Sequence, residues 1–484
     1  MNRYKLFVLM VILLMMFLSG KSQSNLSFYP LENQFNSFNY NPAFLVSQQK
    51  ANFSILPIGG TSIGYNNQEV INDLVSKTLS GITSDQDYKD ILKSMVDHSL
   101  INQKIESTLL TFTFLSKVGF FNFQIREIES FSTAVKGDLT GFLFRSGIQS
   151  AVINQIQNLP AQAMYYREFS LGYSLSTKSN RLAAGIRTKI YFGKAAFFSG
   201  ISGQIIPDPT GGYTLKTDGK VMLSFPGENG KIKTASGKTM SYLMNSGNPG
   251  IGIDLGINYR ILPELSLSMS VTDLGEINWK NNLNSKSFSG QFNFSPESIR
   301  YSTTKSGAEI ITSTESNNSY LDSISSNLSL DIDSSAFGRP MPVRIYTGLK
   351  YQLNPSLKIS LINSYVILKN MNYNSFSIMA GFDMNKNLSV STGYSIIGKS
   401  YKNIPLALLF KKDFGQVYIG TDNLLAFIAP SFSDFAGFTF GACFYLFKNK
   451  DYFNERSDIF QSYKYRTIKK NKRTGVIRKT YPEF

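Results

Sequence analysis

Residues 250–275 read GIGIDLGINYRILPELSLSMSVTDLG and alternate apolar residues with small or polar residues through two consecutive runs. In the first run the apolar positions are Ile251, Ile253, Leu255, Ile257, Tyr259 and Ile261. In the second run, serines and a threonine stand between or beside Leu265, Leu267, Met269 and Val271. Side chains two residues apart share one face of a β-strand, so each run has one apolar and one polar face. Each run is about ten residues long, the length that a tilted strand needs to cross a bilayer.

The same alternation recurs along the chain, at 182–192, 343–352, 357–361, 417–422 and 437–446. Short turns are expected near 177–180, 262–264, 354–355, 383–387 and 412–415. Longer connections alternate with them, near 226–248, 274–342, 369–374, 399–403 and 424–435. Short turns on one side and long loops on the other are typical of outer-membrane barrels. The sequence therefore predicts an all-β membrane protein, an antiparallel up-and-down transmembrane β-barrel of about 14 strands, since such a barrel needs an even number.

The N-terminus predicts a secretion signal over residues 1–22. Arg3 and Lys5 precede an apolar run from Leu6 to Leu18, and small residues follow. A membrane anchor is the alternative, but the run is shorter than the roughly 17–25 residues of a spanning helix. No later apolar run approaches that length, so strands are expected to cross the membrane. We expect a cleaved signal and a location in the cell outer membrane.

Several segments depart from the strand pattern. Apolar residues at spacings of three and four predict short helical inserts at 69–106 and 138–162. The stretch 295–333 is rich in Ser, Thr and Asn and predicts a long polar loop. Residues 448–484 form a basic periplasmic tail without periodicity. The barrel itself is expected to occupy 51–447.

The residues for most enzyme chemistry are scarce. The chain has one cysteine, Cys443, and one histidine, His98, which leaves little for a metal site or a disulfide framework. His98 lies among polar residues of the first insert and is read as a loop histidine. No nucleophile-elbow, Walker or dinucleotide motif stands in a suitable context. We expect no catalytic residue, no cofactor and no metal.

The polar row of the strands carries the candidate functional residues, which lie opposite the apolar row. They are Arg187, Lys189, Asp254, Asn258, Arg260, Arg344, Lys350 and Asp422. In the reverse register each Arg or Lys would face lipid at a cost of roughly 2–4 kcal/mol near the midplane. The row is therefore expected to line the lumen. It predicts either a mildly cationic polar passage or a closed network of ion pairs between the wall and a plug.

Several stretches resemble a known family. They are FNYNPAF at 38–44, FFNFQIRE at 120–127, REFSLGYSLS at 167–176, RLAAGIRTKIYFGKAAF at 181–197 and the run from Gly250 to Trp279. The chain resembles a family of Bacteroidota outer-membrane proteins, domain of unknown function 5723, which looks related to the long-chain fatty-acid transporter type of barrel. Asn41, Pro42 and Ala43 are similar to an Asn-Pro-Ala element of those transporters, whose N-terminal segment folds inside the lumen. The resemblance implies a hatch over residues 23–50; the alternative is a turn before the first strand.

The expected function is passage or capture of a small polar or amphipathic solute without catalysis. The alternative is a sealed barrel that serves as a scaffold or docking subunit of a secretion or surface-assembly machinery. Expected partners are outer-membrane lipid and a small hydrophobic or anionic ligand. The basic residues between Lys464 and Lys479 suggest a periplasmic partner or peptidoglycan, with a solvated tail as the alternative. Although the net charge is +16, nucleic acid is not expected as a partner of a secreted chain.

Overall fold

The computed structural model describes residues 26–446 except 48–50, 57, 67–99, 135–155, 178, 208–212, 226–246, 295–298, 305–306, 313–327, 334, 369–371, 399 and 430–432. The predicted signal peptide, the basic tail and His98 lie outside the described residues.

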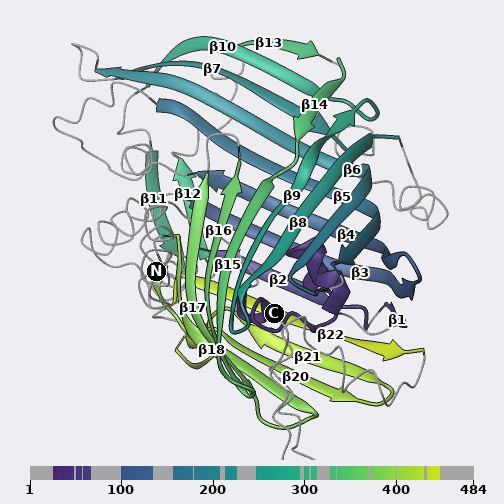
Figure 1. Ribbon diagram of the computed structural model, residues 1–484. Helices are drawn as coiled ribbons and strands as arrows, with labels where there is room; N and C mark the ends of the chain where they lie inside the picture. Colours follow the sequence, from purple (N-terminus) through teal and green to yellow (C-terminus); the bar gives the residue numbers. More distant parts are fainter. Residues whose placement is uncertain are drawn as a thin grey trace, which may run out of the picture.

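Fourteen wall positions close into an antiparallel barrel, as the alternation predicted (Figure 1). In order they are β1 (Ala51–Ile55) with β2 (Thr61–Asn66), β3 (Leu100–Ser116), β4 (Gly119–Ala134), β5 (Ile156–Ser176), β6 (Leu182–Pro207), β8 (Pro249–Leu262), β9 (Leu265–Trp279), β15 (Val343–Asn354), β16 (Leu357–Ile367), β17 (Tyr373–Asp383), β18 (Leu388–Ile397), β20 (Leu406–Lys412), β21 (Gly415–Thr421) and β22 (Phe435–Tyr445). β1 and β2 share one position. Both pair with β3 on one side and with β22 on the other, and these pairings close the wall.

The two ends of the barrel differ in their connections. Short turns at 117–118, 177–181, 263–264, 355–356, 384–387 and 413–414 all lie at one end, here called the turn end. The start of β1 and the end of β22 lie there too, because Asn52 pairs with Tyr445. The opposite end, here called the loop end, carries the longer connections. Short turns face the periplasm in outer-membrane barrels, so the loop end is expected to face outward.

The two faces of the wall follow the sequence alternation. On β8, Ile251 is 72% exposed and Leu255 is 44% exposed, whereas Asp254 between them is fully buried. Exposed apolar side chains cover the outside of the barrel, where lipid would contact them. None of the helices among the described residues is long and apolar enough to span a membrane.

An extra sheet extends the wall at the loop end. The first half of β6 pairs with β8, and its second half pairs instead with β7 (Tyr213–Ser224). β7 pairs with β10 (Ser285–Phe294), and β10 pairs with β13 (Leu328–Asp333). β14 (Phe337–Pro340) pairs with the end of β9, and β19 (Ser400–Asn403) pairs with β18. Figure 1 shows β7, β10 and β13 above the barrel, as a continuation of the wall at β6.

Two predictions about the connections need correction. Residues 100–106 of the first predicted helical insert belong to β3, and residues 156–162 of the second belong to β5. Pairing with neighbouring strands outweighs the helical spacing there, and the rest of both inserts lies outside the described residues. The predicted polar loop at 295–333 contains β13 and a hairpin of β11 (Ile299–Thr304) and β12 (Gly307–Thr312). Each of these strands has only six residues, shorter than the wall strands, and they lie in a stretch rich in Ser, Thr and Asn, so the sequence predicted a loop there.

The N-terminal segment lies inside the barrel. Residues 26–47, here called the hatch, contain three short 3₁₀-helices, η1 (Leu26–Phe28), η2 (Ser37–Asn39) and η3 (Pro42–Ser47). Most aromatic side chains of the hatch are almost fully buried, and Phe28, Phe35 and Phe44 have no exposed surface. These rings form clusters with wall residues such as Tyr346, Tyr418 and Met379. In Figure 1 the purple hatch lies within the ring of strands.

Candidate functional site

A pair of wall glycines receives the Asn-Pro-Ala element of the hatch. Gly185 on β6 and Gly256 on β8 are direct cross-strand partners. A Cβ atom on Gly185 would lie 2.4 Å from the carbonyl carbon of Pro42, and one on Gly256 would lie 2.0 Å from Asn41 Oδ1. No side chain fits at such distances. The two glycines therefore form a notch, here called the glycine notch, that lets the hatch backbone lie directly against the wall.

Asn41 fixes the hatch in this notch through its side-chain amide. Its Nδ2 donates to the carbonyl oxygens of Ile257 at 3.0 Å and Met269 at 3.3 Å. Its Oδ1 accepts from the backbone N–H of Ala43 at 2.9 Å, which shapes the start of η3. Asn41 and Ala43 have no exposed surface. The Asn-Pro-Ala element is thus part of the hatch–wall contact.

Other contacts tie the hatch to distant parts of the wall. Asp422, just after β21, accepts from the backbone N–H of Ser27 at 2.8 Å. Lys350 on β15 forms an ion pair with Glu32 at 2.9 Å. The guanidinium of Arg187 on β6 donates to Asn39. Since these strands lie around the barrel, the hatch is held from several sides.

Tyrosine hydroxyls add neutral hydrogen bonds to this contact. Tyr29 of the hatch lies 2.9 Å from the hydroxyl of Ser268 on β9, and the hydroxyl of Ser270 donates to the carbonyl oxygen of Tyr40 at 2.6 Å. Burial raises the pKa of the Tyr29 and Tyr40 hydroxyls well above the usual range, so both stay protonated. The hatch therefore adds no phenolate charge to the lumen.

Replacing Asn41 by alanine is expected to destabilise the docked hatch by about 1–3 kcal/mol, because buried polar groups lose their partners. The wall strands keep their own ladder, so the effect should stay local. Hydrogen–deuterium exchange of the amides in 35–47 should become faster. Asn385→Ala, at an exposed turn away from the hatch, is the control and should leave those amides unchanged. Equal exchange in intact protein and in Asn41→Ala would contradict this role.

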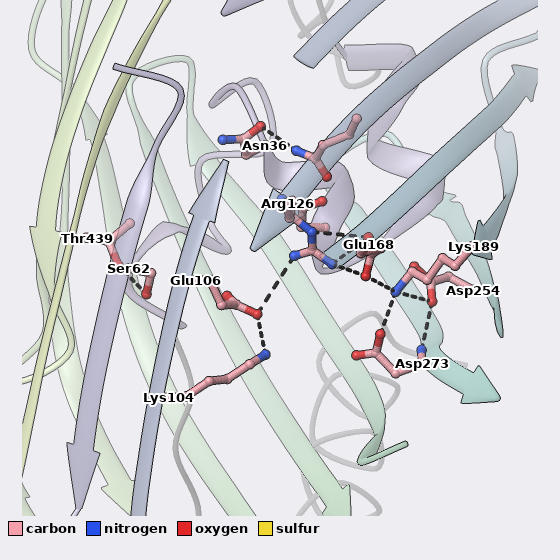
Figure 2. A network of polar contacts seen from close by, with 12 residues as sticks. Asn36, Ser62, Lys104, Glu106, Arg126, Glu168, Lys189, Asp254, Asp273 and Thr439 are labelled. Carbon is pink, nitrogen blue, oxygen red and sulfur yellow. Dashed lines mark hydrogen bonds and ion pairs between the residues drawn. The ribbon is translucent and has the colours of Figure 1, made fainter. Parts of the chain in front are cut away.

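A layer of buried ion pairs runs along the inner wall beside the hatch (Figure 2). Glu168 on β5 accepts from Arg126 on β4 through both carboxylate oxygens, with Nη2 at 2.9 and 2.8 Å. Lys189 on β6 lies 3.6 Å from the same carboxylate. At its other end, Arg126 approaches Glu106 at 3.8 Å, and Glu106 pairs with Lys104 on the same strand. The paired carboxylate and guanidinium satisfy each other, as buried charges require.

The layer continues onto β8 and β9 through Asp254. This carboxylate accepts from Arg187 Nε at 2.7 Å and pairs with Lys189 at 2.8 Å. It also accepts from the backbone N–H of Asp273 at 2.7 Å, where the β8–β9 register shifts. Asp273 has a φ of 63°, a left-handed conformation that aspartate tolerates, and its carboxylate reaches Lys189 at 2.5 Å. The bulge thus directs a second carboxylate at the same lysine.

The charges in this layer balance. Its cations are Lys104, Arg126, Arg187 and Lys189. Its anions are Glu106, Glu168, Asp254 and Asp273. Each cation has at least one anionic neighbour, so the layer serves as a closed network between wall strands and, through Arg187, the hatch. No group of three His, Cys, Asp or Glu side chains suited to a metal ion occurs in the described part of the chain.

The structure brings some of the sequence-predicted residues together and separates others. Arg187, Lys189 and Asp254 belong to the ion-pair layer, whereas Lys350 and Asp422 contact the hatch elsewhere. Asn258 is buried on β8, and Arg260 is partly buried near the turn end. Arg344 lies toward the loop end, where it lines a cavity together with Lys104 and Asp273 of the layer.

Sequence reasoning missed five members of the layer. They are Lys104, Glu106, Arg126, Glu168 and Asp273. Arg126 could have been found, because it continues an inward polar row through Asn122 and Gln124 on β4. Asp273 could not, because the bulge that turns it inward has no signal in the alternation.

A small polar cavity lies beside the ion-pair layer, toward the loop end. Its volume is about 20 Å³, enough for one or two water molecules. The polar side chains that line it include Gln103, Lys104, Ser130, Ser132, Gln162 and Arg344. They come from β3, β4, β5 and β15. Sequence reasoning identified only Arg344 among these six.

A family model described as a family of unknown function, DUF5723, matches residues 42–422. Among solved structures, a TodX deltaS2S3 mutant monoaromatic hydrocarbon channel is 10% identical, with 85% of this chain and 94% of that chain covered and a TM-score of 0.40. The Ralstonia pickettii toluene transporter TbuX is 11% identical, with coverages of 84% and 92% and a TM-score of 0.33. The Pseudomonas putida toluene transporter TodX is 10% identical, with coverages of 88% and 94% and a TM-score of 0.36. Comparison with curated proteins gave no match.

Proposed function

The chain belongs to the DUF5723 family of unknown function. Because the hatch fills its lumen, we propose that it is an outer-membrane barrel that passes or captures a small solute without catalysis. The observation that carries this proposal is the way the hatch is held. Every described contact between hatch and wall is a hydrogen bond, an ion pair or apolar packing, and each of these can be broken and remade. A solute that crosses the barrel must therefore displace the hatch, which acts as the gate.

The glycine notch offers the most direct way to disturb this gate. A single Cβ atom on Gly256 meets Asn41 Oδ1 at 2.0 Å, so it forces the hatch away from β8. A Cβ atom on Gly381, which also faces the hatch, meets Pro30 Cβ at 3.7 Å, an ordinary contact. The two glycines form a matched pair, since one substitution displaces the hatch and the other leaves it in place.

Liposome swelling with the purified chain tests the proposal. We expect Gly256→Ala to admit small neutral sugars several times faster than the intact chain, because the displaced hatch leaves a path through the lumen. Gly381→Ala should behave like the intact chain. Heat-modifiable migration on a detergent gel would show that each barrel is folded.

The sealed scaffold remains the second candidate, and the extra sheet favours it. The described residues give β13 a hydrogen-bonded partner on one side only, β10, so its other edge could pair with a partner protein. If Gly256→Ala displaces the hatch, as shown by faster proteolysis of residues 26–47, and yet admits no solute, the scaffold is favoured over passage.

A further inference from the structure

The wall is short at β20 and β21, which have seven residues each, whereas β5 has 21 and β6 has 26. With a rise of about 3.3 Å per residue and a tilt of about 40°, seven residues cover roughly 18 Å of membrane thickness. The apolar band of an outer-membrane barrel is about 25 Å tall. These two strands alone therefore leave part of the band uncovered on their side of the barrel.

A short helix with exposed apolar side chains follows the end of β21. It is α7 (Leu425–Ile428), in the loop-end connection between β21 and β22. Phe427 is 57% exposed and Ile428 is 70% exposed. The ring of Phe427 packs against that of Phe438 on β22, with 6.2 Å between the ring centroids. Phe438 shares the outward face of β22 with the exposed Phe440, so α7 continues the lipid-facing surface of the wall.

The outward row of β20 extends to the same place. Leu408 and Phe410 are exposed on the outer face of this strand. Ile404 continues their period of two before the strand begins, and it is 38% exposed. The backbone N–H of Leu424, directly before α7, donates to the carbonyl oxygen of Ile404 at 2.7 Å. Ile404 and α7 thus extend one apolar surface beyond the ends of the short strands.

The amide side chain of Asn423, which has no exposed surface, holds this helix against the wall. Its Nδ2 donates to the hydroxyl of Ser433 at 2.6 Å and to the carbonyl oxygen of Phe435 at 3.0 Å. Its Oδ1 accepts from the backbone N–H groups of Ile404 and Leu425, both at 3.2 Å. One buried side chain therefore ties both ends of the connection to the wall, and the exposed apolar side chains of α7 are fixed on the outer surface.

We propose that α7 is embedded in the membrane leaflet at the loop end, where Phe427 and Ile428 contact lipid acyl chains close to the headgroups. The stretch 424–429 reads LLAFIA and contains no polar or charged side chain. Apolar side chains gain free energy when they leave water, and the lipid-facing rows of β20 and β22 bring acyl chains next to them. The helix and Ile404 thus cover the part of the apolar band that the short strands do not reach.

A fluorescent label that spin-labelled lipid can quench tests this contact. The single cysteine, Cys443, is buried, and Cys443→Ala provides the background for Ile428→Cys, which carries a polarity-sensitive dye. The full chain is reconstituted into phosphatidylcholine vesicles that contain a nitroxide lipid. In one arm the nitroxide lies near the headgroup, and in the other it lies near the methyl end of the acyl chain. Heat-modifiable migration on a gel shows that each barrel is folded.

Two control positions receive the same dye. Leu408→Cys lies on the outer face of β20, and Asp218→Cys lies at an exposed position of β7 in the extra sheet. We expect the nitroxide near the headgroup to quench the dye on Ile428→Cys several times more strongly than the dye on Asp218→Cys. The nitroxide near the methyl end should quench Leu408→Cys more strongly than Ile428→Cys.

The inference rests on the membrane location that the proposed function includes, and it does not depend on movement of the hatch. Quenching of Leu408→Cys without quenching of Ile428→Cys would overturn the inference and leave the proposed function standing. Absence of quenching at both positions would contradict the membrane barrel itself. A dye on Ile428→Cys that neither nitroxide lipid nor aqueous iodide reaches would mean that protein covers α7, which would also overturn the inference.

Discussion

Glu168→Gln is expected to lower the free energy of unfolding by about 3–5 kcal/mol, the cost of leaving a buried charge without its partner. Glu168 has no exposed surface and accepts two charged hydrogen bonds from Arg126. Its carboxylate also neutralises Lys189 at 3.6 Å. Glutamine keeps nearly the same volume, so the loss comes from charge rather than from packing. Denaturant unfolding of the purified barrel, followed by tryptophan fluorescence, measures it.

The matched control is Glu127→Gln on the same pair of strands. Glu127 pairs with Arg167 across β4 and β5, one residue away from the buried pair and on the opposite face. Its side chain is 15% exposed, against none for Glu168, and it pairs with one cation whereas Glu168 lies beside two, so the expected loss is smaller, about 1–3 kcal/mol. Adding Arg126→Met to Glu168→Gln should restore part of the stability. Equal losses of unfolding free energy in Glu168→Gln and Glu127→Gln would show that the buried layer contributes no more to stability than the outer ion pair.

Removal of residues 26–47 is expected to turn a closed barrel into an open pore. The wall strands form their ladder with one another, and β22 closes the ring through β1 and β2 without any hatch residue. The hatch fills the lumen with aromatic side chains such as Phe28, Phe35 and Phe44. Without them the polar row faces an aqueous channel, and planar-bilayer recordings should show large, steady conductance steps.

Two controls make the deletion interpretable. Heat-modifiable migration on a gel must show a folded barrel, since Asp422 and Lys350 lose hatch partners. Addition of a synthetic peptide of residues 26–47 should reduce the conductance. A folded deletion barrel that carries no current would mean that something other than the hatch closes the lumen.

The alternation of residues in the sequence determined most of what could be predicted of the fold. Strands between lipid and lumen must place apolar and polar side chains on opposite faces. The sequence alone therefore predicts that Ile251 and Leu255 face lipid and that Asp254 faces the lumen. The extra sheet carries no such requirement. β10 does alternate polar residues with Phe288, Phe292 and Phe294, but it lies within the stretch 274–342 that the sequence predicted to be one long connection.

The candidate site was only partly predictable, for a different reason. The polar row identified Arg187, Lys189 and Asp254, but their partners depend on distances between strands that one sequence does not contain. Glu168 becomes the centre of the layer only when β5 lies between β4 and β6. The glycine notch likewise requires Gly185 and Gly256 to come into register, although both lie in the alternating runs.

Single-channel recording of the intact chain in planar bilayers tests most directly the central claim that the docked hatch closes the lumen. Under conditions in which the chain without residues 26–47 conducts, the intact chain should show no conductance steps at low voltage. Steady conductance through the intact barrel, with the hatch amides still protected from hydrogen exchange, would contradict that claim.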